Sequence, residues 1–129
     1  MIGAEVVRRL FALRAAGPFQ RLEDGELLLI ARHARPRAFT AGKVVIPAGA
    51  VADALFVVLS GAAEVEGRAA PVVFDAPGLL FGLGARADHV AGPEGLETLV
   101  IAKPHVFTIA RECPEFVVGL RDLADGGRA

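Results

Sequence analysis

Three glycines divide the first half of the chain into short apolar runs. Gly42, Gly49 and Gly61 lie at the ends of these runs, and glycine tolerates the positive φ values that tight turns need. The runs 43–46 and 54–59 are rich in β-branched and large apolar residues, as strands require. The sequence here therefore predicts short β-strands that are separated by tight turns.

Further short strands follow, and together they predict a sandwich or a barrel. We expect strands at Arg37–Thr40, Lys43–Ile46, Ala54–Ser60, Ala62–Val65, Val72–Phe74, His89–Ala91 and Leu96–Ala102. We expect turns at Glu66–Arg68, Asp75–Gly78 and Gly92–Gly95. Because side chains alternate along a strand, Leu55, Val57 and Leu59 should share the inner face of an antiparallel sheet.

Helical periodicity lies on both sides of these strands. Apolar residues recur at helical spacing from Ile2 to Leu13, with arginines between them, which predicts an amphipathic helix. A second helix should run from about Asp24 to Arg35. A third helix should begin at Pro104, because proline is favoured in a first helical turn. A fourth should span Glu115–Ala124.

Composition and charge exclude several classes of protein. The 129 residues suit a single domain over 1–129. The net charge is −1 at pH 7, so nothing in the charge balance indicates nucleic acid as a partner. No apolar run approaches a bilayer span and the N-terminus lacks a signal-peptide pattern, so we expect a cytoplasmic protein without a membrane partner. The only cysteine, Cys113, fits a small core residue.

The order of these motifs resembles the cyclic-nucleotide-binding domain family, which includes the regulatory domains of catabolite activators. Three consecutive segments carry the resemblance, namely Gly42–Ile46, Gly49–Asp53 and Leu55–Gly61. The leading helices and the closing helix before Pro114-Glu115 also match the family pattern. The resemblance covers nearly the whole chain. It implies a mainly β fold, a double-stranded β-helix or jelly roll with flanking helices at both ends.

The resemblance also implies where a ligand would bind. The family binds its ligand at a Phe-Gly-Glu, a short helix and an arginine. Amides at a helix N-terminus and an arginine neutralise the cyclic phosphate, and the glutamate accepts from the ribose hydroxyl. Here Phe81 and Gly82 match, whereas Leu83 replaces the glutamate and cannot accept a hydrogen bond. By position, the candidate ligand-binding residues are Phe81, Gly82, Leu83, Gly84, Ala85, Arg86 and His89.

This segment departs from the family pattern in length as well as chemistry. The span from Gly82 to the next strand is several residues shorter, and Arg86 comes earlier than the family's arginine. Arg86 and His89 could form a phosphate clamp of altered geometry, or they could be two exposed side chains on a loop. Gly82 and Gly84 could let the backbone approach an anion, or they could only make a turn. We therefore expect a degenerate phosphate-binding segment.

Other patterns for catalysis or metal binding are missing. His33, His89 and His105 lack the spacing of a metal site on a cupin-like barrel. Ser60 is the only serine and ends a strand in a turn, so no Ser/His/Asp set has support. We expect no metal and no cofactor, although a cyclic nucleotide or another small anion could bind.

These observations predict a non-catalytic regulatory or signalling module with weak or lost cyclic nucleotide binding. The alternative is a ligand-free structural or protein-interaction module, and a cupin-like enzyme has the least support. The chain ends soon after Leu123 without a helix-turn-helix, so we expect no DNA-binding domain. A signal would then pass to an unidentified protein effector or through a homodimer. Phe116, Val117, Leu120 and Leu123 form an apolar stripe that should pair two subunits or pack onto its own β-roll.

Overall fold

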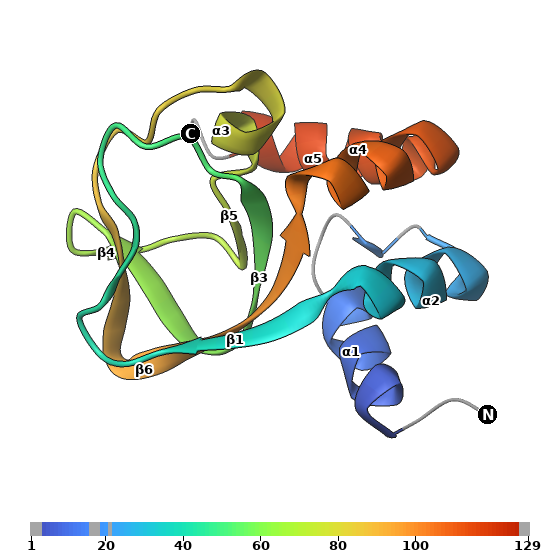
Figure 1. Cartoon of the computed structure of the whole chain (residues 1–129), viewed down its shortest axis with the longest axis horizontal. Coiled ribbons are helices and arrows are strands. Elements are labelled where there is room, and N and C mark those ends of the chain that lie inside the picture. The colour runs from blue at the N-terminus through green and yellow to red at the C-terminus, as the bar shows by residue number, and fades with distance from the viewer. Residues whose placement is uncertain (1–3, 16–18, 21, 127–129) are drawn as a thin grey trace.

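A computed structural model of the chain describes residues 4–15, 19–20 and 22–126. Its helices are α1 (Ala4–Ala15), α2 (Asp24–His33), α3 (Ala76–Phe81), α4 (Lys103–Glu112) and α5 (Pro114–Gly126) (Figure 1). Its strands are β1 (Arg35–Phe39), β2 (Val44–Ile46), β3 (Ala54–Val65), β4 (Arg68–Ala69), β5 (Val73–Phe74) and β6 (His89–Ala102). None of these described helices is long and apolar enough to cross a membrane. Ile2, where the expected first helix began, lies outside the described residues.

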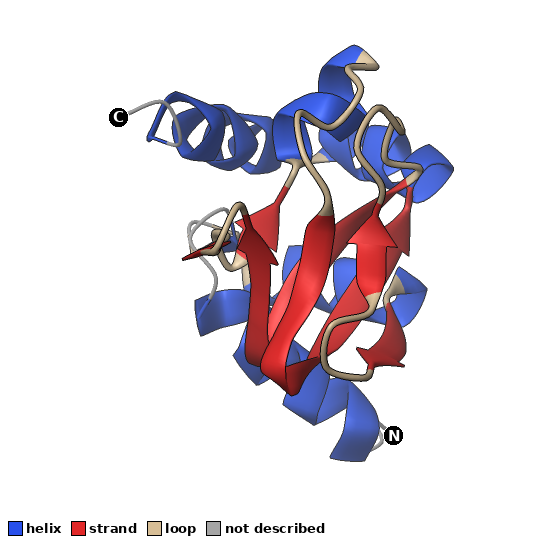
Figure 2. Ribbon diagram, turned by 90° about the vertical axis from the view of Figure 1, so that its left-hand side faces the viewer, coloured by secondary structure: helices blue, strands red, loops and turns tan. Residues whose placement is uncertain are grey.

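Two long strands, β3 and β6, form the spine of an antiparallel sheet. They pair from Ala54 opposite Ala102 to Val65 opposite His89. β1 and β2 add to β6, and β4 and β5 add to β3, which gives the strand order β1-β6-β3-β4. The sheet rolls up between two groups of helices, α1 and α2 at one end and α3 to α5 at the other (Figures 1 and 2). The predicted jelly roll with flanking helices at both ends is confirmed.

The spine bends where two glycines face each other. Gly61 in β3 and Gly95 in β6 have φ values of 73° and 80°. A Cβ atom on Gly61 would lie 2.1 Å from the Gly95 carbonyl oxygen, so only glycine fits there. The register shifts on both sides of Ser60, as at a β-bulge. The two strands expected at Ala54–Ser60 and Ala62–Val65 are therefore one bent strand.

Three local expectations about this region need correction. The turn expected at Gly92–Gly95 lies inside β6, because the bend is made within paired strands. The turn expected at Asp75–Gly78 is the start of α3, since Pro77 sits in its first turn. Leu55 and Val57 are buried as predicted, but Leu59 is exposed because the bulge breaks the alternation.

The Glu66-Gly67 hairpin is confirmed. Val65 pairs with Arg68 across a two-residue loop, and both loop residues have positive φ. This is the backbone of a type I′ turn, whose twist matches that of the strands it joins.

Each of four strands places one ring in a buried row. Phe56 of β3 lies 6.4 Å from Phe39 of β1 and 5.2 Å from Phe74 of β5, measured between ring centroids. Phe74 in turn stacks on His89 of β6 at 5.7 Å. At the end of the roll, Phe19 stacks on Phe116 of α5 at 5.4 Å, and both rings are fully buried. The core therefore joins the N-terminal helices, the strands and the C-terminal helices.

The helices begin and end where local signals predict. Glu23 and Glu26 form a capping box at the start of α2, and Arg32 and His33 lie in its last turn. Cys113 caps α4 and is buried, in agreement with a core role. Burial raises the pKa of its thiol to about 11, and a hydrogen bond to Glu26 adds to the effect. At neutral pH this cysteine is a packed thiol and not a reactive thiolate.

Candidate functional site

The segment that the resemblance marks lies between α3 and β6. α3 ends at Phe81, and Gly82 continues in the left-handed region with a φ of 66°. The chain then runs beside the loop 47–51 before it enters β6 at His89. Val51 and Gly84 form an isolated antiparallel bridge between the two loops.

Backbone hydrogen bonds fix this segment in place. The Gly82 and Leu83 amides both donate to the Gly78 carbonyl, the latter at 3.0 Å. The Ala85 amide donates to the Ala50 carbonyl at 2.9 Å, and Gly49 donates back to Ala85 at 2.8 Å. The amides of residues 82, 83 and 85 are therefore already engaged within the chain. They are not aimed at an open space where an anion could bind.

Gly84 is placed for close contact between the two loops. A Cβ atom there would lie 2.8 Å from the Gly49 carbonyl oxygen. Its φ is not in the left-handed region, so the requirement is space rather than backbone conformation. The structure therefore adds a third interpretation of this glycine, the close packing of one loop on another.

The side chains of the segment divide into outward and inward groups. Phe81 and Leu83 are 69% and 55% exposed, and Arg86 is also exposed. Ala85 is buried beneath them. The structure therefore places Leu83 in solvent, at the position where the family's acceptor belongs. The outward Arg86 fits an exposed loop residue better than one half of a clamp with His89.

His89 points the other way, into the core. It is only 8% exposed and stacks on Phe74. Among the described residues its Nδ1 atom has no hydrogen-bond partner, and neither does Oδ2 of Asp75. Burial raises the pKa of the Asp75 carboxyl, while the charge of His89 and the Gly78 amide lower it. Asp75 is therefore partly buried, with a φ of 54°, and feels the charge of the buried His89.

Two contacts were not foreseen from the sequence. Asp88 accepts a 2.7 Å hydrogen bond from the Ala48 amide, which further ties the segment to the loop 47–51. His33 and His105, which are far apart in the sequence, stack with ring centroids 4.3 Å apart where α2 meets α4. In the part of the chain that the structure describes, no group of three or more His, Cys, Asp or Glu could hold a metal ion.

The fold is shared with several solved structures. The Thermus thermophilus catabolite activator protein is 22% identical with a TM-score of 0.72, over 85% of this chain and 57% of that one. The regulatory domain of Toxoplasma gondii PKA, co-crystallised with cAMP, is 16% identical with a TM-score of 0.68, over 84% and 46%. No protein-family model and no curated protein sequence matches this chain.

A third similar structure bears on ligand choice. It is the regulatory subunit of a cAMP-independent protein kinase A from Trypanosoma cruzi, bound to guanosine. It is 16% identical with a TM-score of 0.70, over 86% of this chain and 41% of that one. The chain spans about half the length of these structures. The chain therefore shares the fold of these structures, as the resemblance predicted.

Proposed function

We propose that this chain is a non-catalytic regulatory module with a cyclic-nucleotide-binding fold and weak or lost cyclic nucleotide binding. The observation that carries the proposal is that the amides of Gly82, Leu83 and Ala85 donate within the chain while the Leu83 side chain faces solvent. A bound phosphate needs free donors, and the ribose hydroxyl needs an acceptor. Neither free amide donors nor a side-chain acceptor is present at Gly82, Leu83 and Ala85.

The size of the loss follows from the missing contacts. A hydrogen bond to a charged group contributes on the order of 1.5–3 kcal/mol, which is roughly one to two decades in affinity. Loss of the glutamate alone would leave a weak site. Loss of the amides adds a second cost, because the loop would have to break its bonds to Ala50 and Gly78 before it could bind an anion.

Calorimetry with cAMP, cGMP and guanosine at physiological salt tests this proposal. We expect no cyclic nucleotide to bind more tightly than a dissociation constant of roughly 100 µM. Guanosine separates the effect of the engaged amides from that of the missing acceptor. It lacks the phosphate that those amides would have to bind, but it keeps the ribose hydroxyl that needs the acceptor. A micromolar or tighter dissociation constant for cAMP would refute the proposal.

A ligand-free interaction module is the second candidate. Phe81 and Leu83 favour it, because they present exposed apolar side chains where the family holds a polar ligand. In either case we propose that the module acts in the cytoplasm through an unidentified protein effector. Neither membrane nor nucleic acid is part of the proposal.

A homodimer through α5 also remains a proposal, with a smaller surface than the sequence suggested. Phe116 and Leu120 are fully buried within the chain, and the side chain of Leu123 lies outside the described residues. Val117 and Val118 stay exposed on α5. Val117→Glu is therefore the better test than a change at Leu120. Sedimentation should show a dimer that becomes a folded monomer in the variant, and a monomeric wild type at high concentration would end the dimer proposal.

A further inference from the structure

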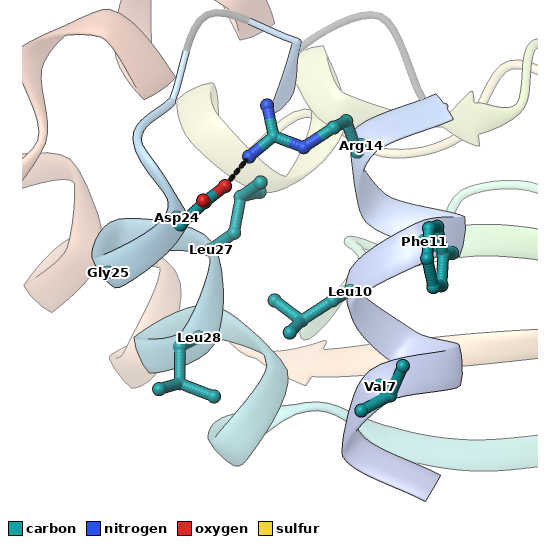
Figure 3. Close-up of a pocket in the computed structure, with 8 residues that line it drawn as sticks. All are labelled: Val7, Leu10, Phe11, Arg14, Asp24, Gly25, Leu27 and Leu28. Atoms are coloured by element: carbon teal, nitrogen blue, oxygen red, sulfur yellow. Dashed lines mark hydrogen bonds and ion pairs between the residues drawn. The ribbon is translucent and has the colours of Figure 1, made fainter. Parts of the chain in front are cut away.

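An apolar groove lies between α1 and α2, at the opposite end of the roll from α3 (Figures 1 and 3). Its volume is about 410 Å³. Leu10 of α1 and Leu27 of α2 line it, with Val7 one turn before Leu10 and Leu28 next to Leu27. Phe11 stands beside it and is 73% exposed. A ring this exposed next to an apolar hollow marks an interaction surface.

The shape of the groove fits one more helix. Its two walls are the faces of neighbouring helices, so a third amphipathic helix would complete a small bundle. Gly25 lines the groove and has nothing within 4 Å of where a Cβ atom would lie, so a partner backbone can approach closely. Apolar residues spaced at i, i+3, i+4 and i+7 on the incoming helix would then meet Leu10, Phe11 and Leu28.

An ion pair lies at one end of the groove, and an exposed arginine lies on α2 toward the other end. Arg14 of α1 forms an ion pair with Asp24 of α2 at one end (Figure 3). The Asp24 side chain is 97% exposed despite this pair, so its carboxylate can accept further donors. Asp24, Leu28 and Arg32 follow at four-residue spacing and share one face of α2. The exposed Arg32 therefore sets a positive charge at the other end.

We propose that this groove docks an amphipathic helix of a partner protein. The helix carries a Lys or Arg that meets Asp24 and an Asp or Glu that meets Arg32. Asp24 and Arg32 lie about 12 Å apart along α2 at 1.5 Å per residue, so the partner's charges are about two turns apart. The docking surface goes beyond the proposed function, because it does not involve residues 81–89 and needs no nucleotide.

A synthetic helix tests the proposal on the full chain. The probe is a fluorescein-labelled, alanine-based peptide with Leu at i, i+3, i+4 and i+7. It carries a Lys at i−1 and a Glu at i+6, which lie about two turns apart on one side of the Leu stripe. Fluorescence anisotropy should give a dissociation constant of roughly 1–100 µM. Phe11→Ala should weaken binding roughly ten- to hundredfold, since it removes an aromatic anchor. Phe107→Ala, which truncates another exposed ring on α4, is the matched control and should leave binding unchanged.

A charge reversal tests the orientation independently of the apolar contact. Arg32→Glu should weaken binding of the Lys/Glu peptide roughly three- to tenfold and strengthen binding of a Lys/Lys peptide. Arg111→Glu changes the same charge on α4 and should do neither. Both arginines are exposed, so both variants should fold, as circular dichroism can verify.

Three results would overturn the proposal. The first is no change in anisotropy up to about 1 mM protein, which leaves less than about 4 kcal/mol of binding free energy. The second is an equal effect of Phe11→Ala and Phe107→Ala, which would place the peptide elsewhere. The third is a dimer in sedimentation that Phe11→Ala dissociates while the peptide does not bind. That last result would make a second copy of the chain the occupant of the groove.

Discussion

At the scale of single residues, the bend of the sheet depends on Gly61. An alanine there would place its Cβ atom against the Gly95 carbonyl oxygen and would adopt a positive φ. We expect Gly61→Ala to lower the free energy of unfolding by roughly 2–4 kcal/mol, as measured by urea titration. Gly25→Ala is the control, because its site is open and helical, and it should be neutral or stabilising by up to about 1 kcal/mol. Equal effects would show that the glycine pair does not set the bend.

Asp75 gives a second prediction at this scale, through its pH dependence. Burial raises the pKa of its carboxyl in the folded chain. The folded state then binds the proton more tightly than the unfolded state, so stability falls as pH rises through the range above the ordinary pKa. Asp75→Asn removes this loss and keeps a residue that tolerates the left-handed region. Its unfolding free energy relative to wild type should be higher at pH 7 than at pH 3, and a pH-independent difference would contradict the burial effect.

At the scale of elements, the sequence predicts what local signals determine. The α2 capping box and the Glu66-Gly67 hairpin were foreseeable because their hydrogen bonds join neighbouring residues. The start of α3 was missed because Asp75-Ala76-Pro77-Gly78 suits a turn and a first helical turn equally well. The unbroken β6 was missed because Gly95 is a turn signal along the chain, and only its partner across the sheet makes it a bend.

The candidate site shows the same limit more strongly. That Leu83 cannot accept a hydrogen bond was evident from its identity alone. That the amides of residues 82, 83 and 85 are engaged depends on Gly78 and on Ala50, and Ala50 lies in a different loop. No local pattern carries a contact between loops more than thirty residues apart. The inward direction of His89 likewise depends on Phe74, which its own strand does not contain.

The loop 82–85 allows the two proposed causes of weak or lost binding, the missing acceptor and the engaged amides, to be tested separately. Leu83→Glu restores a carboxylate where the family has one, but it leaves the Ala85 amide bonded to Ala50. We expect calorimetry to show no gain larger than roughly tenfold in affinity for cAMP. Since Leu83 is exposed, the variant should fold, and its melting temperature provides the control. A micromolar site in this variant would show that the missing acceptor alone had abolished binding.

At the scale of the whole molecule, the two groups of helices are joined by two stacked pairs of rings, His33 on His105 and Phe19 on Phe116. Phe19 precedes α2, Phe116 belongs to α5, and their centroids are 5.4 Å apart. A shift of α4 and α5 would therefore move α2 and change the groove between α1 and α2. This connection is the physical route by which a regulatory module with this fold could link its C-terminal helices to a partner bound at α1 and α2.

Phe116→Ala tests whether that contact holds the molecule together. The ring is fully buried, so its removal leaves a cavity, and we expect a loss of roughly 3–5 kcal/mol in the free energy of unfolding. Val117→Ala is the matched control, because Val117 is the next residue of α5 and its side chain is 42% exposed. This variant should change the free energy of unfolding by less than about 0.5 kcal/mol. Hydrogen exchange should show that amides of α2 lose protection along with those of α5. Loss confined to α5 would mean that the two ends of the roll are stabilised separately.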